Sequence, residues 1–271
     1  MNNLIQRIIT GILFGVLVLG SAFLGPIYQT VIFGIFMVIG LWEYYRMCSQ
    51  SELLNISMWV GMFAGITTFL ILTGVQFEFI PIGSYVLIMP ILFSIMVVEL
   101  WKNHPQPIMN IAVTLLGIIY VVIPIYISVL LGSSSKHLLP NVVGMLFLIW
   151  TNDTMAYFIG KTWGKRKLFE RISPKKTWEG TIGGLFFTLI IGFIIGTYIN
   201  QGLTFFWLIA ALIVGPSAIL GDLIESLFKR NLAIKDSGNL LPGHGGVLDR
   251  FDAALFSIPF FYCWYILYFN W

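Results

Sequence analysis

The sequence predicts an all-α, polytopic integral membrane protein with about nine transmembrane helices. Hydrophobic residues make up 58% of the 271 positions, and charged residues only 10%. A soluble domain carries roughly 25% charged residues, and an exterior this apolar would associate in water. The lengths of the apolar runs give the number of helices, because one helical span of the bilayer needs about 20 apolar residues.

Nine apolar runs are long enough to span a membrane. We expect each to be helical, because a helix satisfies its own backbone hydrogen bonds inside lipid. The eighth should continue beyond the membrane as a polar helix. The predicted spans are 8–25, 28–46, 57–75, 79–99, 107–131, 140–160, 179–200, 203–224 and 251–270.

The distribution of polar residues divides the chain near residue 140. Residues 1–140 form N-terminal membrane helices, which could also carry the interface of a homodimer. Residues 141–271 form a C-terminal region that contains the cytosolic polar loops. We expect the two regions to form one structural unit.

Lysine and arginine predict the orientation, because basic residues gather in cytoplasmic loops. If the N-terminus and every second loop share one side, that side holds 14 of the 15 basic residues, and Lys136 alone is on the other. The nine-span topology therefore places the N-terminus in the cytosol and the C-terminus outside, in the cell membrane. The basic loops after residues 160 and 224 are cytosolic in any version of the count.

Two local patterns have simple structural explanations. Glu43 and Arg46 are three residues apart near the cytosolic end of the second span, and we interpret them as an interfacial pair whose charges reach the headgroups. G-x-x-x-G spacing recurs from Gly180 and again from Gly192. That spacing favours close helix packing over chemistry.

Polar residues become dense after residue 150, and the first of three clusters is Asn152-Asp153 in the sixth span. Tyr157 follows Asp153 by four residues and shares its helical face. A carboxylate at membrane depth is costly and usually faces a cavity or a polar partner. Asp153 is therefore a candidate site residue, with helix packing as the alternative explanation.

The second cluster is the basic loop after residue 160. Ser173-Pro174 is typical of a helix N-cap followed by the first helical residue, which places Lys175 and Lys176 in the first turn. Cations at that end oppose the helix dipole unless they share an anion with the helix N-terminus. The pattern favours phosphate binding over a topology signal alone.

The third cluster, residues 221–252, is the most informative. Asp222, Ser226 and Arg230 recur at steps of four on a predicted helix. Asp249 and Asp252 are three apart where the last span begins. Between them, the turn from residue 242 to 246 (Pro-Gly-His-Gly-Gly) has little side-chain bulk, so backbone amides can approach a ligand closely.

These residue types suit phosphate transfer. Asp222, Asp249 and Asp252 offer oxygen ligands for a divalent metal, which can bridge phosphates and stabilise a departing pyrophosphate. Basic residues that would neutralise phosphate oxygens are Lys229, Arg230, Lys235 and Arg250. Each feature alone is weak, but their density in an otherwise uncharged chain predicts a phosphate-transfer site.

The third cluster also resembles the signature of the phosphatidate cytidylyltransferase family, S-x-x-K-R-x4-K-D-x5-P-G-H-G-G-x-x-D-R-x-D. The match runs from Ser226 to Asp252 without a departure. The stretches at Asn152-Asp153 and at residues 173–180 also look like family motifs. The resemblance therefore covers roughly residues 150–255, whereas the first half is similar only in length and hydrophobicity.

The resemblance implies that CTP and phosphatidic acid react to give CDP-diacylglycerol and pyrophosphate at the cytosolic face of the membrane. It implies membrane lipids as partners, no nucleic acid, a divalent cation such as Mg²⁺, and a monovalent cation such as K⁺ beside it. The implied metal ligands are Asp222, Asp249 and Asp252. The implied catalytic residues are these three with Lys229, Arg230 and Lys235. The implied substrate-binding residues are Asn152, Asp153, Ser173, Lys175, Lys176, Thr177, Glu179, Ser226, Asp236, His244, Gly245, Gly246 and Arg250.

Other functions stay open on the sequence alone. A CDP-alcohol phosphatidyltransferase would resemble D-G-x2-A-R-x8-G-x3-D-x3-D, and the chain has no such run. A polyprenol or dolichol kinase that uses CTP is a second enzyme alternative. A transporter is the alternative from a different class, but its charged residues would lie near the midplane in two related halves.

Overall fold

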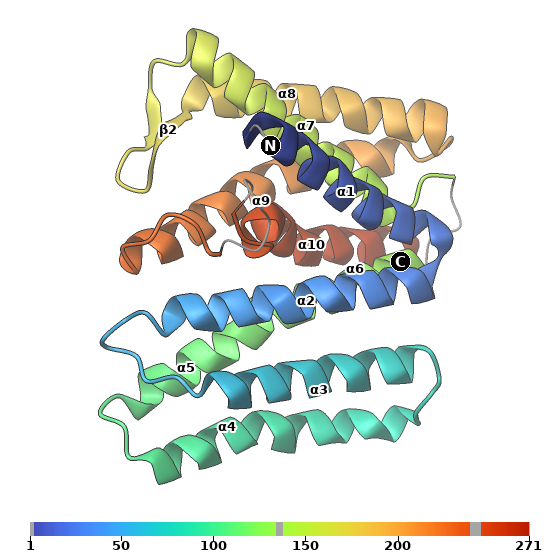
Figure 1. Ribbon diagram of the computed structural model, residues 1–271. Coiled ribbons are helices and arrows are strands. Elements are labelled where there is room, and N and C mark those ends of the chain that lie inside the picture. The colour runs from blue at the N-terminus through green and yellow to red at the C-terminus, as the bar shows by residue number, and fades with distance from the viewer. Residues whose placement is uncertain (1–2, 134–137, 239–244, 271) are drawn as a thin grey trace. The chain divides into compact units, whose positions relative to one another are not determined.

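The computed structural model describes residues 3–133, 138–238 and 245–270, with side chains from residue 10 onward (Figure 1). Its α-helices are α1 (Asn3–Leu24), α2 (Pro26–Cys48), α3 (Met58–Gln76), α4 (Ile88–Lys102), α5 (Pro107–Gly117), α6 (Ile123–Ser133), α7 (Asn141–Trp163), α8 (Trp178–Ile194), α9 (Thr204–Asn231) and α10 (Leu248–Phe269). A 3₁₀ turn, η1 (Ile82–Leu87), precedes α4, and π turns η2 (Ile118–Val122) and η3 (Ile195–Ile199) extend α5 and α8. Lys136 lies outside the described residues.

The predicted polytopic helical fold is confirmed. Within the described ranges, eight helices are long and apolar enough to cross a membrane, and they match the second to ninth predicted spans. The first predicted span corresponds to α1, whose stretch Thr10–Leu24 is apolar. As predicted, the eighth span continues as a polar helix, because α9 runs without a break to Asn231. The described residues also contain an antiparallel hairpin, formed by β1 (Lys167–Phe169) and β2 (Ser173–Thr177).

The chain forms two compact units. The first contains residues 1–130 together with 232–250, and the second contains residues 131–231 together with 251–271. Residues 232–238 and 245–250 therefore belong to the same unit as the N-terminal helices. Helix α10 begins in the first unit and continues in the second. That the chain behaves as one structural unit stays a prediction.

In the first unit, α2, α3 and α4 lie side by side (Figure 1). Hydrogen bonds from two adjacent tyrosines hold α2 against α5 inside this apolar environment. The Tyr45 hydroxyl donates to the Thr114 carbonyl at 2.7 Å, and the Tyr44 hydroxyl donates to the Val113 carbonyl at 3.1 Å. Because both carbonyls belong to one helix, the two bonds fix the C-terminal half of α2 against α5.

In the second unit, α8 packs along α7 and α9. A Cβ on Gly184 would lie 2.8 Å from the Asn152 carbonyl oxygen of α7, and one on Gly192 would lie 2.6 Å from the Trp207 carbonyl oxygen of α9. Only glycine permits such close approach. The interpretation of the G-x-x-x-G repeats as packing sites is therefore confirmed at these two positions.

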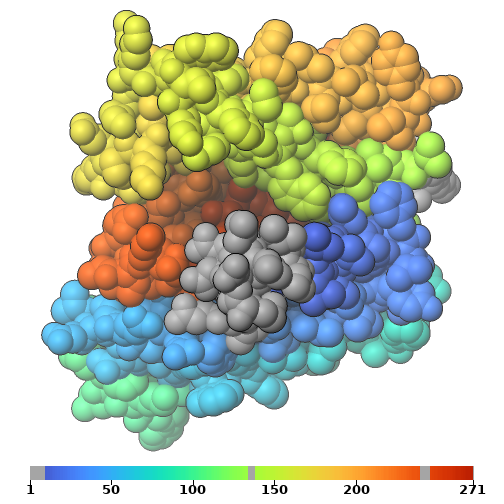
Figure 2. All heavy atoms as spheres, turned by 45° about the horizontal axis from the view of Figure 1, so that its top comes forward, coloured from blue at the N-terminus to red at the C-terminus, as the bar shows by residue number. Residues whose placement is uncertain are grey.

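The hairpin β1–β2 protrudes beyond the ends of α7 and α8, as Figures 1 and 2 show in yellow. Its apolar residues pack on α9, where Ile172 lies in a small buried cluster with Ile219 and Leu223. This packing sets the hairpin beside the polar end of α9.

Candidate active site

The basic loop after residue 160 folds as a hairpin, so the predicted helix start at Ser173-Pro174 is wrong. Residues 173–177 form β2, and α8 begins at Trp178. The N-cap is Thr177, whose Oγ1 accepts a hydrogen bond from the Gly180 N–H at 3.2 Å. Two N-cap signals compete in this segment, and Thr177 prevails because pairing with β1 holds residues 173–177 extended.

The strand changes the roles of the two lysines. Lys175 and Lys176 do not lie in a helical first turn, so the argument from the helix dipole fails. Successive side chains of a strand point to opposite faces. Lys175 is exposed, whereas the half-buried Lys176 forms an ion pair with Asp222 of α9, Nζ to Oδ2 at 2.6 Å.

Glu179 holds the hairpin to the start of α8. Its carboxylate accepts hydrogen bonds from the Lys165 N–H at 3.0 Å and the Arg166 N–H at 3.2 Å. The neighbouring Trp178 N–H donates to the Arg166 carbonyl at 2.9 Å. Glu179 therefore has a structural role, and the predicted contact with substrate stays a prediction.

Three helices of the second unit bring carboxylates together. Asp153 of α7, Asp222 of α9 and Asp252 of α10 interact electrostatically with one another. Polar neighbours support them, since Asn152 Nδ2 donates to Asp153 Oδ1 at 3.4 Å and the Ser226 hydroxyl donates to Asp222 Oδ1 at 3.3 Å. The structure thus gathers predicted residues that are up to 99 positions apart in sequence, as 252 minus 153 gives.

Glycine 221 lets α9 approach α10 beside this cluster. A Cβ there would lie 2.8 Å from the Asp252 carbonyl oxygen and 3.0 Å from the Ala253 Cα. Any side chain would push the two helices apart. The pairing of Asp222 with Asp252 therefore depends on the glycine that precedes Asp222.

Lys229 is held by a carboxylate that is not among the predicted site residues. Its Nζ lies 2.6 Å from Glu225 Oε2, one helical turn earlier on α9. Glu225 is fully buried, and Lys229 also interacts electrostatically with Asp252. The only signal in the sequence was the four-residue spacing of this acid and lysine.

Asp249 belongs to the first unit, where its carboxylate binds backbone amides of Ser237 and Gly246. Its carboxylate accepts hydrogen bonds from the Ser237 N–H at 3.1 Å and the Gly246 N–H at 2.8 Å. Gly245 adopts φ +81°, and a Cβ there would lie 2.6 Å from Asp249 Oδ2. In this arrangement the Gly246 amide serves a protein carboxylate, so its predicted contact with substrate stays a prediction.

Glu43 and Arg46 do not form the interfacial pair that we inferred from the sequence. Glu43 is fully buried and accepts a 2.8 Å hydrogen bond from the Leu248 N–H, 205 residues later. Arg46 is exposed and lies over the Trp42 ring, 5.0 Å from its centre. The spacing misled because a backbone donor far along the chain provides the partner of Glu43.

The remaining predicted residues lie at the surface or cannot be placed. Four of them are exposed: Arg230, Lys235, Asp236 and Arg250. His244 lies outside the described residues, as do Pro242 and Gly243. Within the described ranges, no group of three or more His, Cys, Asp or Glu side chains could hold a metal ion as it stands. The predicted metal role of Asp222, Asp249 and Asp252 therefore stays a prediction.

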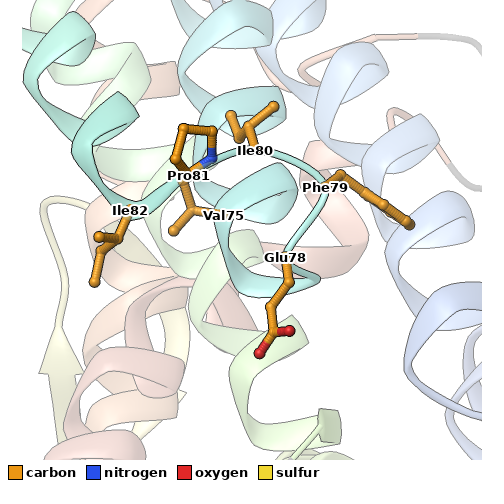
Figure 3. A pocket seen from close by; sticks show the side chains of 6 residues that line it. All are labelled: Val75, Glu78, Phe79, Ile80, Pro81 and Ile82. Carbon is orange, nitrogen blue, oxygen red and sulfur yellow. The ribbon is translucent and has the colours of Figure 1, made fainter.

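A shallow hollow of about 550 Å³ opens at the turn between α3 and α4 (Figure 3). Its lining consists of Val75, Glu78, Phe79, Ile80, Pro81 and Ile82. A single carboxylate and no basic group line it, so it does not suit a phosphate. None of the predicted site residues belongs to it.

Comparison with known proteins places the whole chain among enzymes that act on cytidine nucleotides. A sequence model described as the cytidylyltransferase family matches residues 5–268. A phosphatidate cytidylyltransferase of Bacillus subtilis is 30% identical over 271 residues, which cover 97% of each chain. One of Haemophilus influenzae is 33% identical over 284 residues, which cover 96% of this chain and 98% of that protein. One of Staphylococcus aureus strain COL is 48% identical over 113 residues, 41% of this chain and 44% of that protein.

Proposed function

The chain belongs to the cytidylyltransferase family and is a nucleotidyltransferase, and on this premise we propose that it joins CTP to phosphatidic acid, with release of pyrophosphate. Two relatives that align over nearly its full length are named phosphatidate cytidylyltransferases. The observation that carries the proposal is the gathering of Asp153, Asp222 and Asp252 with Lys176 and Lys229 in the second unit. Carboxylates interleaved with lysines suit a reaction between two phosphate groups.

The proposed reaction is an in-line displacement at phosphorus. An oxygen of the lipid phosphate attacks the α-phosphorus of CTP, the bond to the β-phosphate oxygen breaks, and pyrophosphate leaves with that electron pair. A phosphate monoester has its second pKa near 6, so its oxygen is already ionised near pH 7. No strong base is needed, and catalysis rests on positioning and charge neutralisation.

The lysines are the groups that would neutralise phosphate charge. In the structure Lys176 pairs with Asp222, and Lys229 pairs with Glu225. A phosphate oxygen can replace Asp222 as the partner of Lys176 without moving the strand, because a lysine has three donors on a flexible stem. The buried Glu225 keeps Lys229 directed along α9, and the positive charge of Lys229 acts on Asp252.

The carboxylates suit a divalent cation. Mg²⁺ is commonly bound by one or two protein carboxylates together with waters and substrate phosphates, and Asp222 and Asp252 provide such a pair. When bound, Mg²⁺ would be held by Asp222 and Asp252 and would supply positive charge that neutralises the phosphate groups. A role for Asp249 and for a monovalent cation such as K⁺ belongs to the same proposal.

We place this site at the cytosolic face of the cell membrane, where CTP is available and the acyl chains stay in lipid. The 14-to-1 distribution of basic residues supports this orientation. Exposed tryptophans, which favour either membrane interface, lie at helix ends that the proposed topology assigns to the cytosolic side. These are Trp59, Trp101, Trp163 and Trp178.

We expect the purified protein to transfer the α-phosphate of CTP, and not the γ-phosphate, to lipid. The test uses phosphatidic acid in mixed micelles with CTP labelled at either position. Metal-dependent entry of the α-label into lipid, with equal release of pyrophosphate, supports the proposal. Transfer of the γ-label to a polyprenol would indicate a CTP-dependent kinase. Solute flux in proteoliposomes without turnover would indicate a transporter.

The proposed orientation predicts that the hairpin is inaccessible to impermeant reagents in intact cells. In a variant with Cys48 and Cys263 replaced by serine, Arg171→Cys should react with an impermeant maleimide only after the cytosolic face is opened. Gln201→Cys, in the exposed turn before α9, should react in intact cells. Reaction of Arg171→Cys in intact cells would place the site on the wrong side for CTP.

A further inference from the structure

The buried carboxylate of Glu43 is not explained by packing or by the reaction chemistry. Glu43 lies on α2 within a membrane span and is 0% exposed. Removing a carboxylate from water costs free energy unless it is hydrogen-bonded or paired. Its Oε2 accepts a 2.8 Å hydrogen bond from the N–H of Leu248, the first residue of α10. The first four N–H groups of a helix lack partners within the helix, and a negative charge is favourable there.

The chain around Glu43 is shaped to receive this carboxylate. A Cβ on Gly238 would lie 2.5 Å from Glu43 Oε1, and a Cβ on Gly246 would lie 2.6 Å from Oε2. Any side chain at either position would collide with the carboxylate. Gly246, which the sequence suggested for close approach to a ligand, instead lets the backbone approach Glu43, and Gly238 does the same.

The part of α2 that carries Glu43 is held in place by hydrogen bonds to α5. Tyr44 and Tyr45, its neighbours on α2, are both hydrogen-bonded to carbonyls of α5. Asp249 also accepts hydrogen bonds from the backbone amides of Ser237 and Gly246. Two carboxylates therefore bind backbone amides here: Glu43 of α2 binds that of Leu248, and Asp249 of α10 binds those of Ser237 and Gly246.

We propose that Glu43 is a positioning residue, which caps the N-terminus of α10 from α2 and so fixes the helical turn that carries Asp249, Arg250 and Asp252. The inference rests on the proposed function for its catalytic consequence, because those three residues belong to the proposed site. It assigns a role in turnover to the N-terminal half of the chain, which the sequence left without chemistry. Glu43 acts through α10 and does not contact the reacting atoms.

The test compares two buried carboxylates of the same unit. Glu99 is 4% exposed, and its Oε1 lies 2.6 Å from Asn110 Nδ2 and 2.9 Å from His104 Nδ1, outside residues 232–250. The variants Glu43→Ala, Glu43→Gln, Glu99→Ala and Glu99→Gln are purified in detergent. Three quantities are measured: the melting temperature, hydrogen exchange of peptides that cover residues 245–252, and kcat and KM with CTP and phosphatidic acid.

We expect Glu43→Ala to speed hydrogen exchange of residues 245–252 about tenfold, the size of effect that loss of a helix cap produces. Its kcat should fall at least as much, with a smaller change in KM for CTP. Glu43→Gln should retain part of the protection from exchange and part of kcat, because its amide oxygen can still accept a hydrogen bond from the Leu248 N–H. The Glu99 variants should lower the melting temperature to a similar extent without either local effect.

Several outcomes would overturn the inference. If Glu43→Ala and Glu99→Ala change exchange and kcat equally, Glu43 supports only the general stability of the fold. If Glu43→Ala does not fold, Glu43→Gln decides, and unchanged exchange with unchanged kcat in that variant refutes the role. If the wild-type protein does not turn over CTP and phosphatidic acid, the proposed function fails. The exchange measurements still decide whether Glu43 holds the start of α10.

Discussion

Replacing Asp222 or Asp252 by asparagine is expected to lower turnover by about a hundredfold or more, while the protein still folds and inserts. The two carboxylates interact electrostatically within one unit, and their like charges repel each other when no cation is bound. A single asparagine removes a proposed metal ligand and also relieves this repulsion. Residues that act as a unit are not additive, so the double variant should be scarcely slower than either single one.

Turnover over a magnesium titration, together with melting temperatures, provides the measurement. Without metal, the single variants should melt at or above the wild-type temperature. Added Mg²⁺ should raise the melting temperature of the wild type more than that of either variant, because a ligand that binds only the folded state stabilises it. Near-normal turnover of a variant at ordinary magnesium would show that its aspartate is not a ligand. If the double variant does not fold, the carboxylates are structural.

Asp249→Asn is expected to behave differently from these variants. Asp249 accepts hydrogen bonds from two backbone amides, and an asparagine would offer one oxygen where the carboxylate offers two. We therefore expect a lower melting temperature as well as lower turnover. The spacing of the three aspartates predicts one shared role, because it does not reveal which of them also binds backbone amides of the chain.

Much of the fold could be predicted because membrane spans depend on local composition. A window of about 20 apolar residues is sufficient to identify a span, and eight such helices lie where the sequence placed them. The continuation of α9 to Asn231 could also be predicted from local sequence, because the four-residue spacing of its polar residues continues past the apolar run. The hairpin was missed because a Ser-Pro cap signal competed with Thr177, and only tertiary pairing decides between them.

The residues of the candidate site also divide into those that local sequence identifies and those that only the tertiary structure reveals. The motifs identified Asp222 and Asp252, which the structure brings together, because the chemistry of phosphate transfer requires carboxylates and few others exist in the chain. The supporting acids Glu43 and Glu225 were not selected. The partner of Glu43 is 205 residues away, and burial of Glu225 depends on how α9 packs. Neither the distant partner nor the burial can be inferred from the local amino-acid sequence.

Lys176→Gln is expected to reduce kcat/KM for CTP or phosphatidic acid by about tenfold to a hundredfold, and Lys175→Gln by much less. A charge-assisted hydrogen bond to phosphate contributes roughly 1.5–3 kcal/mol, which corresponds to this range. The two lysines are adjacent and equally charged, but the strand directs only Lys176 toward Asp222. The sequence pattern predicts the same role for both lysines, so the difference between them tests the geometry of the hairpin.

Lys167→Gln provides the matched control, because Lys167 is an exposed lysine of the same hairpin and belongs to none of the predicted site residues. All three variants are assayed in neutral detergent and again in vesicles with anionic lipid. The loss in Lys176→Gln should persist in neutral detergent, where lipid charge cannot attract the hairpin. If the three variants lose activity equally, and only in anionic vesicles, the lysines attach the hairpin to the membrane surface. Lys176 then has no separate role at the phosphates.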